Sequence, residues 1–392
     1  MPISQFRNLV FEGGGVKGIA YAGAIQVLES QGILPNITRV AGTSAGAITA
    51  TLLALGAGSQ DIAKIVGGTD FRQFMDSSLL PTSNIWRLVQ DYGWYKGDAF
   101  ATWMQGIIKQ RTGDAGTTFA GLRALKAHDV KGRGAFRDLY MVGTDLSRQQ
   151  ALIFSGDDTP DMPLWYAART SMSIPFFFRS VMAQGEVRVD GGVSWNYPID
   201  MFDDRRFLED PKKGVKPDYP TLYSDDQVYN KETLGFRVDT ADEIAAEKRS
   251  WQSPPDKVHD IEDYIKALVG FMLDTANKTH LHDDDWHRTV FIDAAGIGAT
   301  DFGLTQAQIK MLITNGVQGA TAYLKWFTNA KAKVKPLNKR KKDGGREAAV
   351  PSWADEPDYQ ITQRSLLTIG LSSGTFQVFW NCGMLAKVPF TR

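Results

Sequence analysis

The chain is organised around residues 6–47, which read FRNLVFEGGGVKGIAYAGAIQVLESQGILPNITRVAGTSAGA. Two short apolar runs in this stretch are each followed by a glycine-punctuated turn and then by a helical pattern of apolar residues. A strand that passes through a tight turn into a helix, and does so twice, is typical of a parallel sheet covered by helices. The stretch therefore predicts an α/β fold.

The second turn places a serine between two glycines. Residues 38–41 are the predicted strand end, Gly42-Thr43-Ser44-Ala45-Gly46 is the bend, and residues 47–55 are the predicted helix. G-x-S-x-G at such a position is the sequence form of a nucleophile elbow, because the glycines let a strained turn close and lift the serine hydroxyl above the sheet. The free amides at the helix N-terminus also favour a developing negative charge. The same letters arise by chance in loops rich in small residues, so the motif alone predicts a simple turn equally well.

The first turn, Gly13-Gly14-Gly15-Val16-Lys17-Gly18, lies between a predicted strand at residues 6–11 and a predicted helix at residues 19–28. Its exposed amides suit an anion, and the same glycines spell the G-x-G-x-x-G of dinucleotide-binding folds. A dinucleotide site requires an acidic residue at the end of the second strand, where this chain has Gly42-Thr43-Ser44. No Walker lysine-serine pair follows the glycines, which excludes a P-loop. The remaining use is an oxyanion hole for acyl transfer at Ser44.

Three motifs occur in a fixed order along the chain. They are the glycine loop at residues 13–18, the G-x-S-x-G at residues 42–46 and an Asp-Gly-Gly at residues 190–192. This order resembles the patatin-like phospholipases, with weaker similarity at Gly143-Thr144-Asp145-Leu146, ARTSMSIPFFF (residues 168–178) and Asn196-Tyr197-Pro198. The resemblance covers about residues 6–330, and three ordered motifs are more specific than any one of them.

The resemblance implies a three-layer α/β/α domain around a mostly parallel sheet, with Ser44 as nucleophile and Asp190 as the base that touches it directly. The implied oxyanion hole consists of the amides of Gly13, Gly14 and Gly15. The implied supporting residues are Lys17, Gly42, Gly46, Gly191 and Gly192. The implied activity is lipid acyl ester hydrolysis of the phospholipase A or lysophospholipase type, with a phospholipid or other lipid ester as substrate and without metal or cofactor.

Two other interpretations remain open at this point. Ser44, Asp190 and a downstream histidine follow the Ser, Asp, His order of α/β-hydrolases. The candidate histidines are His259, His280, His282 and His287. A dyad is favoured because the elbow follows the second strand, the glycine loop shortly precedes it, and Asp190 begins an Asp-Gly-Gly, all as in the resembled family. A non-catalytic nucleotide- or lipid-binding module would need the glycine loop but not the serine.

Residues 280–287, HLHDDDWH, contain three histidines and three aspartates. Imidazole and carboxylate are ordinary ligands of zinc, manganese or iron. No helix or turn pattern fixes the third ligand, however, and an acidic surface loop has the same composition. We therefore predict no metal site here.

Periodicity predicts the remaining elements of the domain. Strands are expected at residues 139–144, 151–154, 181–189 (a hairpin turning at Gln184-Gly185), 234–238 and 289–292. Helices are expected at residues 61–74, 82–95, 98–110, 163–171, 258–279 and 305–326. The polar stretch at residues 201–257, apart from its one strand, is expected mainly on the surface.

Composition bounds the partners and the compartment. The chain has 392 residues, of which 44 are basic and 44 acidic, and this balance argues against a nucleic-acid partner. The single cysteine, Cys382, excludes an internal disulfide and fits a reducing compartment. We see no charged and apolar leader before Phe6 and no run approaching about 18 apolar residues. We expect a cytoplasmic protein, and export by a non-classical route is compatible with the same features.

Three regions are expected: a catalytic domain at residues 1–330, a basic flexible linker at residues 331–350 and a C-terminal extension at residues 351–392. Residues 331–346 carry eight basic side chains and one acidic one. Such a stretch either makes transient contact with an anionic membrane surface, worth about 1 kcal/mol per basic residue near it, or is a solvated tether. The extension alternates apolar and polar residues, as strands do.

Overall fold

The computed structural model describes residues 3–76, 92–128, 136–210, 212, 227–239, 258–259, 264, 267–272, 283–329, 368–372, 375–380 and 383–389. Two compact units divide between residues 341 and 342. The described part of the C-terminal unit is an antiparallel sheet of β11 (Thr368–Ser372), β12 (Thr375–Trp380) and β13 (Gly383–Pro389). The basic stretch at residues 331–346 lies outside the described residues.

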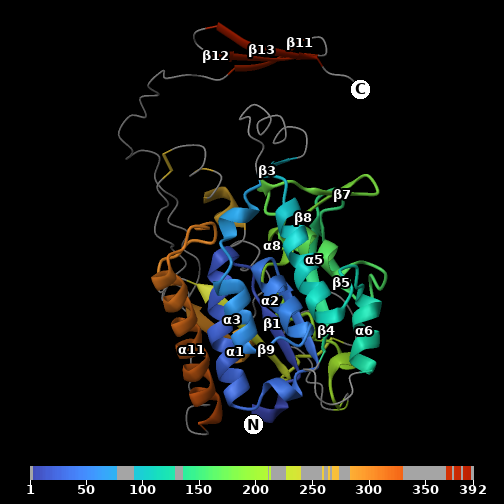
Figure 1. Cartoon of the computed structure of the whole chain (residues 1–392), viewed down its shortest axis with the longest axis vertical. Coiled ribbons are helices and arrows are strands. Elements are labelled where there is room, and N and C mark those ends of the chain that lie inside the picture. Colours follow the sequence, from blue (N-terminus) through green and yellow to red (C-terminus); the bar gives the residue numbers. More distant parts are fainter. Residues whose placement is uncertain are drawn as a thin grey trace. The chain divides into compact units, whose positions relative to one another are not determined.

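The N-terminal unit is built on one large, mostly parallel sheet (Figure 1). Its spatial order is β10-β9-β1-β2-β4-β8-β7, and β5 also pairs with β4. The pairs from β10 to β4 are parallel, whereas β5, β8 and β7 join in antiparallel orientation. The strands are β1 (Asn8–Phe11), β2 (Arg39–Thr43), β4 (Asp138–Asp145), β5 (Gln150–Ser155), β7 (Val181–Ala183), β8 (Glu186–Asp190), β9 (Thr233–Asp239) and β10 (Thr289–Asp293). The predicted α/β class is confirmed.

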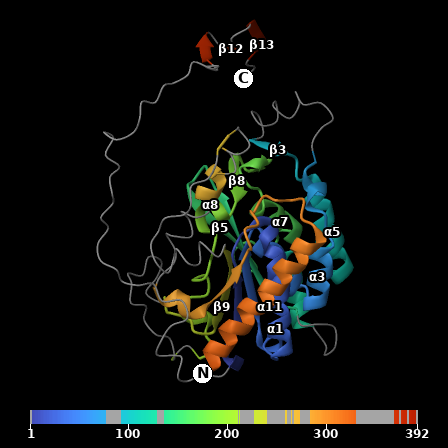
Figure 2. The same ribbon diagram turned by 90° about the vertical axis from the view of Figure 1, so that its left-hand side faces the viewer.

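Helices flank this sheet (Figures 1 and 2). They are α1 (Ala20–Ser30), α2 (Ala45–Ala54), α3 (Ser59–Gly67), α5 (Asp98–Thr112), α6 (Phe119–Ala127), α7 (Leu164–Ser171), α8 (Gly192–Trp195) and α11 (Gln306–Thr328). Short 3-10 helices occur at Ile3–Gln5, Gly15–Ile19, Leu34–Asn36, Phe71–Phe74, Arg205–Phe207 and Asp283–Arg288. In the described part of the chain, we find no helix with the length and apolar character needed to cross a bilayer.

One predicted helix is wrong where it can be compared with the structure. Residues 82–91 of the expected helix at residues 82–95 lie outside the described residues, and Gly93–Tyr95 forms a strand, β3, that pairs with β6 (Phe176–Phe178). The apolar pattern did not predict this strand, because its pairing partner is distant in sequence. The two strands approach closely at Gly93, where a Cβ would lie only 2.2 Å from the Phe178 backbone. Of the expected helix at residues 258–279, residues 267–272 are helical and most of the others are not described.

The two faces of the sheet are covered differently. Successive residues of a strand point to opposite faces, so Leu9 and Phe11 pack with the helices in the larger core while Val10 packs with Tyr197 and Phe202. In the described residues, the second face is covered by α8 and residues 196–207. The segment after Asp190 is therefore fixed to the back of the central strands.

A buried ion pair is an exception to the expectation that residues 201–257 lie mainly on the surface, and more than half of these residues lie outside the described part of the chain. Asp203 is 3% exposed and accepts hydrogen bonds from Arg288 at 2.6 and 2.7 Å, and Arg288 also binds Asp285. A guanidinium between two carboxylates compensates charges that would otherwise be costly to bury. The polar composition did not reveal this burial, because Arg288 lies 85 residues beyond Asp203.

Two glycines let α1 and α11 approach backbone to backbone. A Cβ on Gly23 would lie 1.9 Å from the carbonyl oxygen of Ile313, and a Cβ on Gly316 would lie 1.9 Å from that of Ala20. No side chain fits between these helices at the crossing, because the distance between packed helices is set by the residues at their contact. The position of α11 against α1 thus depends on the absence of a methyl group on each side.

We expect Gly316→Ala to destabilise the protein by about 1–3 kcal/mol or more, because the added methyl forces the two helices apart. Gly106→Ala is the matched control: Gly106 is exposed in α5 and its Cβ position has nothing within 4 Å. That change should stabilise by about 0.5–1 kcal/mol through helix propensity. Urea unfolding of both variants measures the difference, and equal stabilities would contradict the close helix crossing.

Candidate active site

Ser44 stands on a strained bend between β2 and α2. Its φ of 52° and ψ of −120° are unusual for a residue with a side chain, and such strain persists only where the surroundings enforce it. A Cβ on Gly42 would lie 2.3 Å from the Gly46 backbone, and a Cβ on Gly46 would lie 2.3 Å from the carbonyl oxygen of Phe11. The Ser44 amide donates to Ser171 Oγ at 2.9 Å, which anchors the turn to α7. The predicted elbow geometry is present.

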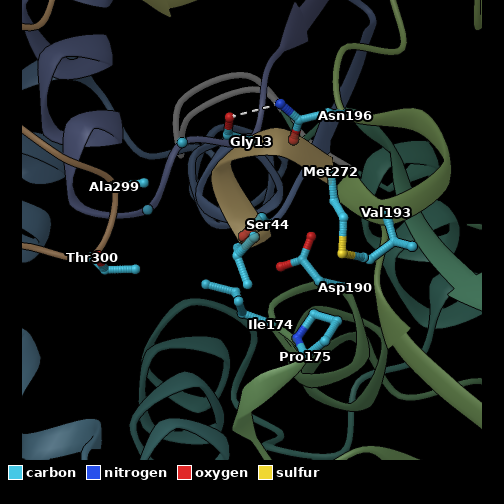
Figure 3. Close-up of a pocket in the computed structure, with 13 residues that line it drawn as sticks. Gly13, Ser44, Ile174, Pro175, Asp190, Val193, Asn196, Met272, Ala299 and Thr300 are labelled. Atoms are coloured by element: carbon cyan, nitrogen blue, oxygen red, sulfur yellow. Dashed lines mark hydrogen bonds between the residues drawn. The ribbon is translucent and has the colours of Figure 1, made fainter. Parts of the chain in front are cut away.

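Asp190 ends β8 and is 1% exposed. Its Oδ1 accepts a hydrogen bond from the Gly192 amide at 2.7 Å, whereas its Oδ2 is buried and makes no regular hydrogen bond with any residue that the structure describes. Figure 3 shows the carboxylate of Asp190 directed toward Ser44. Gly191 makes this position possible, because a Cβ there would lie 2.3 Å from the carbonyl oxygen of Val142 on β4. The sheet thus brings together two predicted residues that lie far apart in sequence.

Burial sets the protonation of Asp190. Removal from water raises the pKa of its carboxyl to about 7 from an ordinary value of 3.8, against smaller lowering effects of the Gly192 amide and the Ser44 hydroxyl. A carboxyl whose pKa lies near neutrality accepts and returns a proton readily at physiological pH. Asp190 therefore has the protonation behaviour that a general base requires.

The glycine loop presents fewer amides than the sequence predicted. The Gly13 amide donates to the Asn196 carbonyl at 3.0 Å, so that donor is already engaged. Within the residues that the structure describes, the amides of Gly14 and Gly15 donate to no protein acceptor. Gly15 has a φ of 54°, and a Cβ there would lie 1.9 Å from the Ala299 carbonyl oxygen. Of the three expected donors, only the amides of Gly14 and Gly15 are therefore without a described protein acceptor, and their role in an oxyanion hole stays a prediction.

Lys17 lies beside the loop rather than in the pocket. Its amide donates to the Gly14 carbonyl at 3.2 Å, and its side chain approaches the Cβ position of Gly14 to 3.5 Å. Its positive charge helps to lower the pKa of buried Glu12, although burial is the larger effect and raises that pKa to about 8. The contacts of Lys17 are therefore consistent with the predicted role of supporting the conformation of the glycine loop.

A small pocket joins these groups (Figure 3). It is lined by Gly13, Gly14, Gly15, Ser44, Ile174, Pro175, Asp190, Val193, Asn196, Val269, Met272, Ala299 and Thr300. Its enclosed volume is about 20 Å³, which is room for little more than one water molecule. Val269 and Met272 come from the helical residues 267–272, so this segment supplies part of the apolar wall of the pocket.

Sequence reasoning gave no role to Asn196 and did not identify the apolar wall of the pocket. Asn196 was visible only as part of Asn196-Tyr197-Pro198, a motif without a stated chemistry. Ile174 and Pro175 also belong to a quoted motif, whereas Met272 and Ala299 come from segments with no local pattern that points to a site. Their placement depends on contacts between distant parts of the chain.

No histidine lines the pocket in the described part of the chain. His287 stacks on Trp326 with ring centroids 6.2 Å apart, and His280 and His282 lie outside the described residues. The described residues also contain no group of three potential metal ligands. The predicted absence of a metal at residues 280–287 stays a prediction, because His280 and His282 are not described.

Comparisons with known proteins agree with this geometry. Residues 9–203 match a family described as patatin-like phospholipase. The chain is 30% identical over 337 residues to the uncharacterized protein YqhO of Bacillus subtilis (strain 168), covering 81% of this chain and 98% of that protein. It is 33% identical over 202 residues to the uncharacterized protein R571 of Acanthamoeba polyphaga mimivirus, covering 51% of this chain and 63% of that one.

The crystal structure of VipD from Legionella pneumophila has a similar fold. The TM-score is 0.51 at 18% identity, and the match covers 82% of this chain and 67% of that chain. A mostly parallel sheet, a serine on a strained elbow and an Asp-Gly-Gly aspartate beside it accompany the sequence match. The chain belongs to the patatin-like phospholipase family.

Proposed function

We propose that this protein hydrolyses lipid acyl esters through a Ser44-Asp190 dyad. The observation that carries the proposal is the buried carboxylate of Asp190, which faces Ser44 in a pocket that Gly14 and Gly15 also line and whose Oδ2 makes no regular hydrogen bond with a described residue. A buried carboxylate oxygen without a hydrogen bond costs stability, so its retention beside a strained serine fits a catalytic role.

The reaction proceeds in two steps. Asp190 takes the hydroxyl proton as Ser44 Oγ attacks the ester carbonyl carbon, and the amides of Gly14 and Gly15 stabilise the resulting oxyanion. The ester C–O bond breaks, and Asp190 returns the proton to the leaving alcohol. In the second step a water molecule gives its proton to Asp190 and attacks the acyl-enzyme, after which Ser44 leaves and regains a proton. No cofactor takes part in this scheme.

The apolar lining of the pocket favours a lipid ester of the phospholipase A or lysophospholipase class as the substrate. The pocket walls beside the dyad are formed by apolar side chains of Ile174, Pro175, Val193 and Met272. Apolar walls favour an acyl chain over a polar acyl group because they remove hydrocarbon from water. Transient contact with a membrane surface supplies such a substrate.

Two alternative functions receive less support. A Ser-His-Asp esterase needs an imidazole between Ser44 and Asp190, and no described histidine lines that pocket. A dinucleotide site needs an open glycine loop, whereas the Ala299 carbonyl packs on Gly15 and accepts a hydrogen bond from the Val16 amide at 3.0 Å. The acidic residue that would bind a ribose is also replaced by the elbow at the end of β2.

We expect Ser44→Ala and Asp190→Asn each to reduce hydrolysis of a short-chain phospholipid by about 10³-fold or more, because one lacks the nucleophile and the other lacks the proton acceptor. A fluorophosphonate probe should label wild type on Ser44 and leave Ser44→Ala unlabelled, as read by mass spectrometry. His259→Ala and His287→Ala are the controls and should keep near wild-type rates. A folded histidine variant as inactive as Ser44→Ala would replace the dyad with a triad.

The pH dependence of kcat/KM should report Asp190. Because only the carboxylate accepts the serine proton, kcat/KM should rise with pH and level off above an apparent pKa of about 7. Steady-state rates on a soluble ester between pH 4 and 9 test this. A plateau already reached near pH 5 would show that the reactive carboxyl has an ordinary pKa.

Stability should depend on pH in the opposite direction. Between pH 3.8 and about 7, folded Asp190 keeps a proton that the unfolded chain loses, so the free energy of unfolding falls as pH rises. Asp190→Asn removes this cost and should be more stable than wild type at pH 8 by up to about 4 kcal/mol, with little difference near pH 4. Urea unfolding at both pH values measures it, with Ser44→Ala as the control that keeps the carboxyl. A difference that is equal at both pH values would contradict the raised pKa.

A further inference from the structure

Asn196 holds Gly13 at two points. The Gly13 amide donates to the Asn196 backbone carbonyl at 3.0 Å, and Asn196 Nδ2 donates to the Gly13 carbonyl at 3.2 Å (Figure 3). Asn196 is 2% exposed, so water does not compete for these bonds. Gly13 is the first residue of the glycine loop, and a Cβ there would lie 2.3 Å from Asn196 Oδ1. The loop and this side chain are therefore fitted to each other.

The bond to the Gly13 carbonyl also determines where the next amide points. In a planar trans peptide, the C=O of one residue and the N–H of the next lie on opposite sides. Figure 3 shows the Gly13 carbonyl directed to Asn196 and away from Ser44. The Gly14 N–H, which belongs to the same peptide, is consequently directed away from Asn196. Rotation of this peptide would turn the Gly14 donor away from its present direction.

The orientation of the Asn196 amide follows from its partners. A flipped amide would place Oδ1 against the Gly13 carbonyl oxygen, where two acceptors repel each other. In the observed orientation, Oδ1 is buried and accepts no hydrogen bond from a described residue, which is unfavourable for a polar atom. A residue retained for stability alone would not leave this atom unpaired. The cost points to a role for the Nδ2 donor.

The short helix α8 links Asn196 to Asp190 along the chain, and it also contacts the residue next to Ser44. Asp190 lies just before α8, and Asn196 follows its last residue. Thr43 Oγ1, beside Ser44, donates to the Trp195 carbonyl at 3.0 Å. The segment that contains the proposed base, Asp190, thus also contains Asn196, which hydrogen-bonds to the glycine loop.

We propose that Asn196 is a positioning residue that aims the Gly14 amide at the developing oxyanion. This inference rests on the proposed ester hydrolysis and adds a residue to it. Asn196 itself does not contact the reacting atoms. Its contribution is made in the transition state, when charge appears on the carbonyl oxygen, so its loss should lower kcat and leave KM almost unchanged.

Two variants separate positioning from stability. Asn196→Leu keeps the size of the side chain and removes both the Nδ2 donor and the unpaired Oδ1, and Asn196→Ala removes the side chain. Asn8→Ala is the matched control, because Asn8 is fully buried at the opposite end of β1, where it binds Thr233 and Arg39. All proteins are assayed on a short-chain phospholipid and titrated with a trifluoromethyl ketone, whose serine adduct carries an oxyanion.

Both Asn196 variants should lose about 10- to 100-fold in kcat, and the inhibition constant of the ketone should rise by the same factor while KM stays nearly constant. Asn8→Ala should lose stability but keep kcat and ketone affinity. Folded Asn196 variants with wild-type kcat and ketone affinity would overturn the inference. So would a crystal structure of Asn196→Ala with the Gly13-Gly14 peptide unchanged. Wild type that neither hydrolyses esters nor reacts with a fluorophosphonate would instead refute the proposed function.

Discussion

Contact between backbone segments without intervening side chains is the constraint on which this site depends. Gly46 lies against the end of β1, Gly191 against β4, and Gly15 against the Ala299 carbonyl. Each glycine occupies the carboxyl edge of the sheet, where strand ends and helix starts crowd together. A single Cβ at these points would separate the elbow, the Asp-Gly-Gly bend or the glycine loop from its neighbour. Their spacing therefore follows from steric exclusion.

The same crowding excludes water from this edge of the sheet, and the loss of solvation raises the pKa of the acidic residues there. Asp190 loses water and gains mainly the Gly192 amide, so burial raises its pKa to about 7. Burial also raises the pKa of Glu12, which follows β1, to about 8, although the positive charge of Arg237 opposes this shift. Charged forms of such acids are costly in the folded state, whereas a pKa near neutrality is what the proposed role of Asp190 as a base requires. Stability and reactivity are thus opposed at these positions.

Much of the fold could be predicted because its elements have local causes. Glycine-rich turns between apolar strands and periodic helices predicted β1, β2, α1 and α2, and apolar periodicity predicted α11, within a few residues of their observed ends. β3 was missed because pairing with β6 overrides a local pattern that is compatible with a helix. The burial of Asp203 was not predicted, because its charge is compensated by Arg288, a distant residue that no local sequence pattern indicates.

The sequence by itself determined the family, the serine turn and the order of the three glycine-containing motifs, since each depends on a few adjacent residues. Only the tertiary structure decided which groups meet at the site. Antiparallel pairing of β8 with β4 brings Asp190 to the edge where Ser44 lies, and the fold of α8 onto the sheet brings Asn196 to Gly13. That contact occupies the Gly13 amide and leaves Gly14 and Gly15 as donors. A hydrogen-bond donor is free or engaged according to what lies next to it in space, and residues distant in sequence determine that.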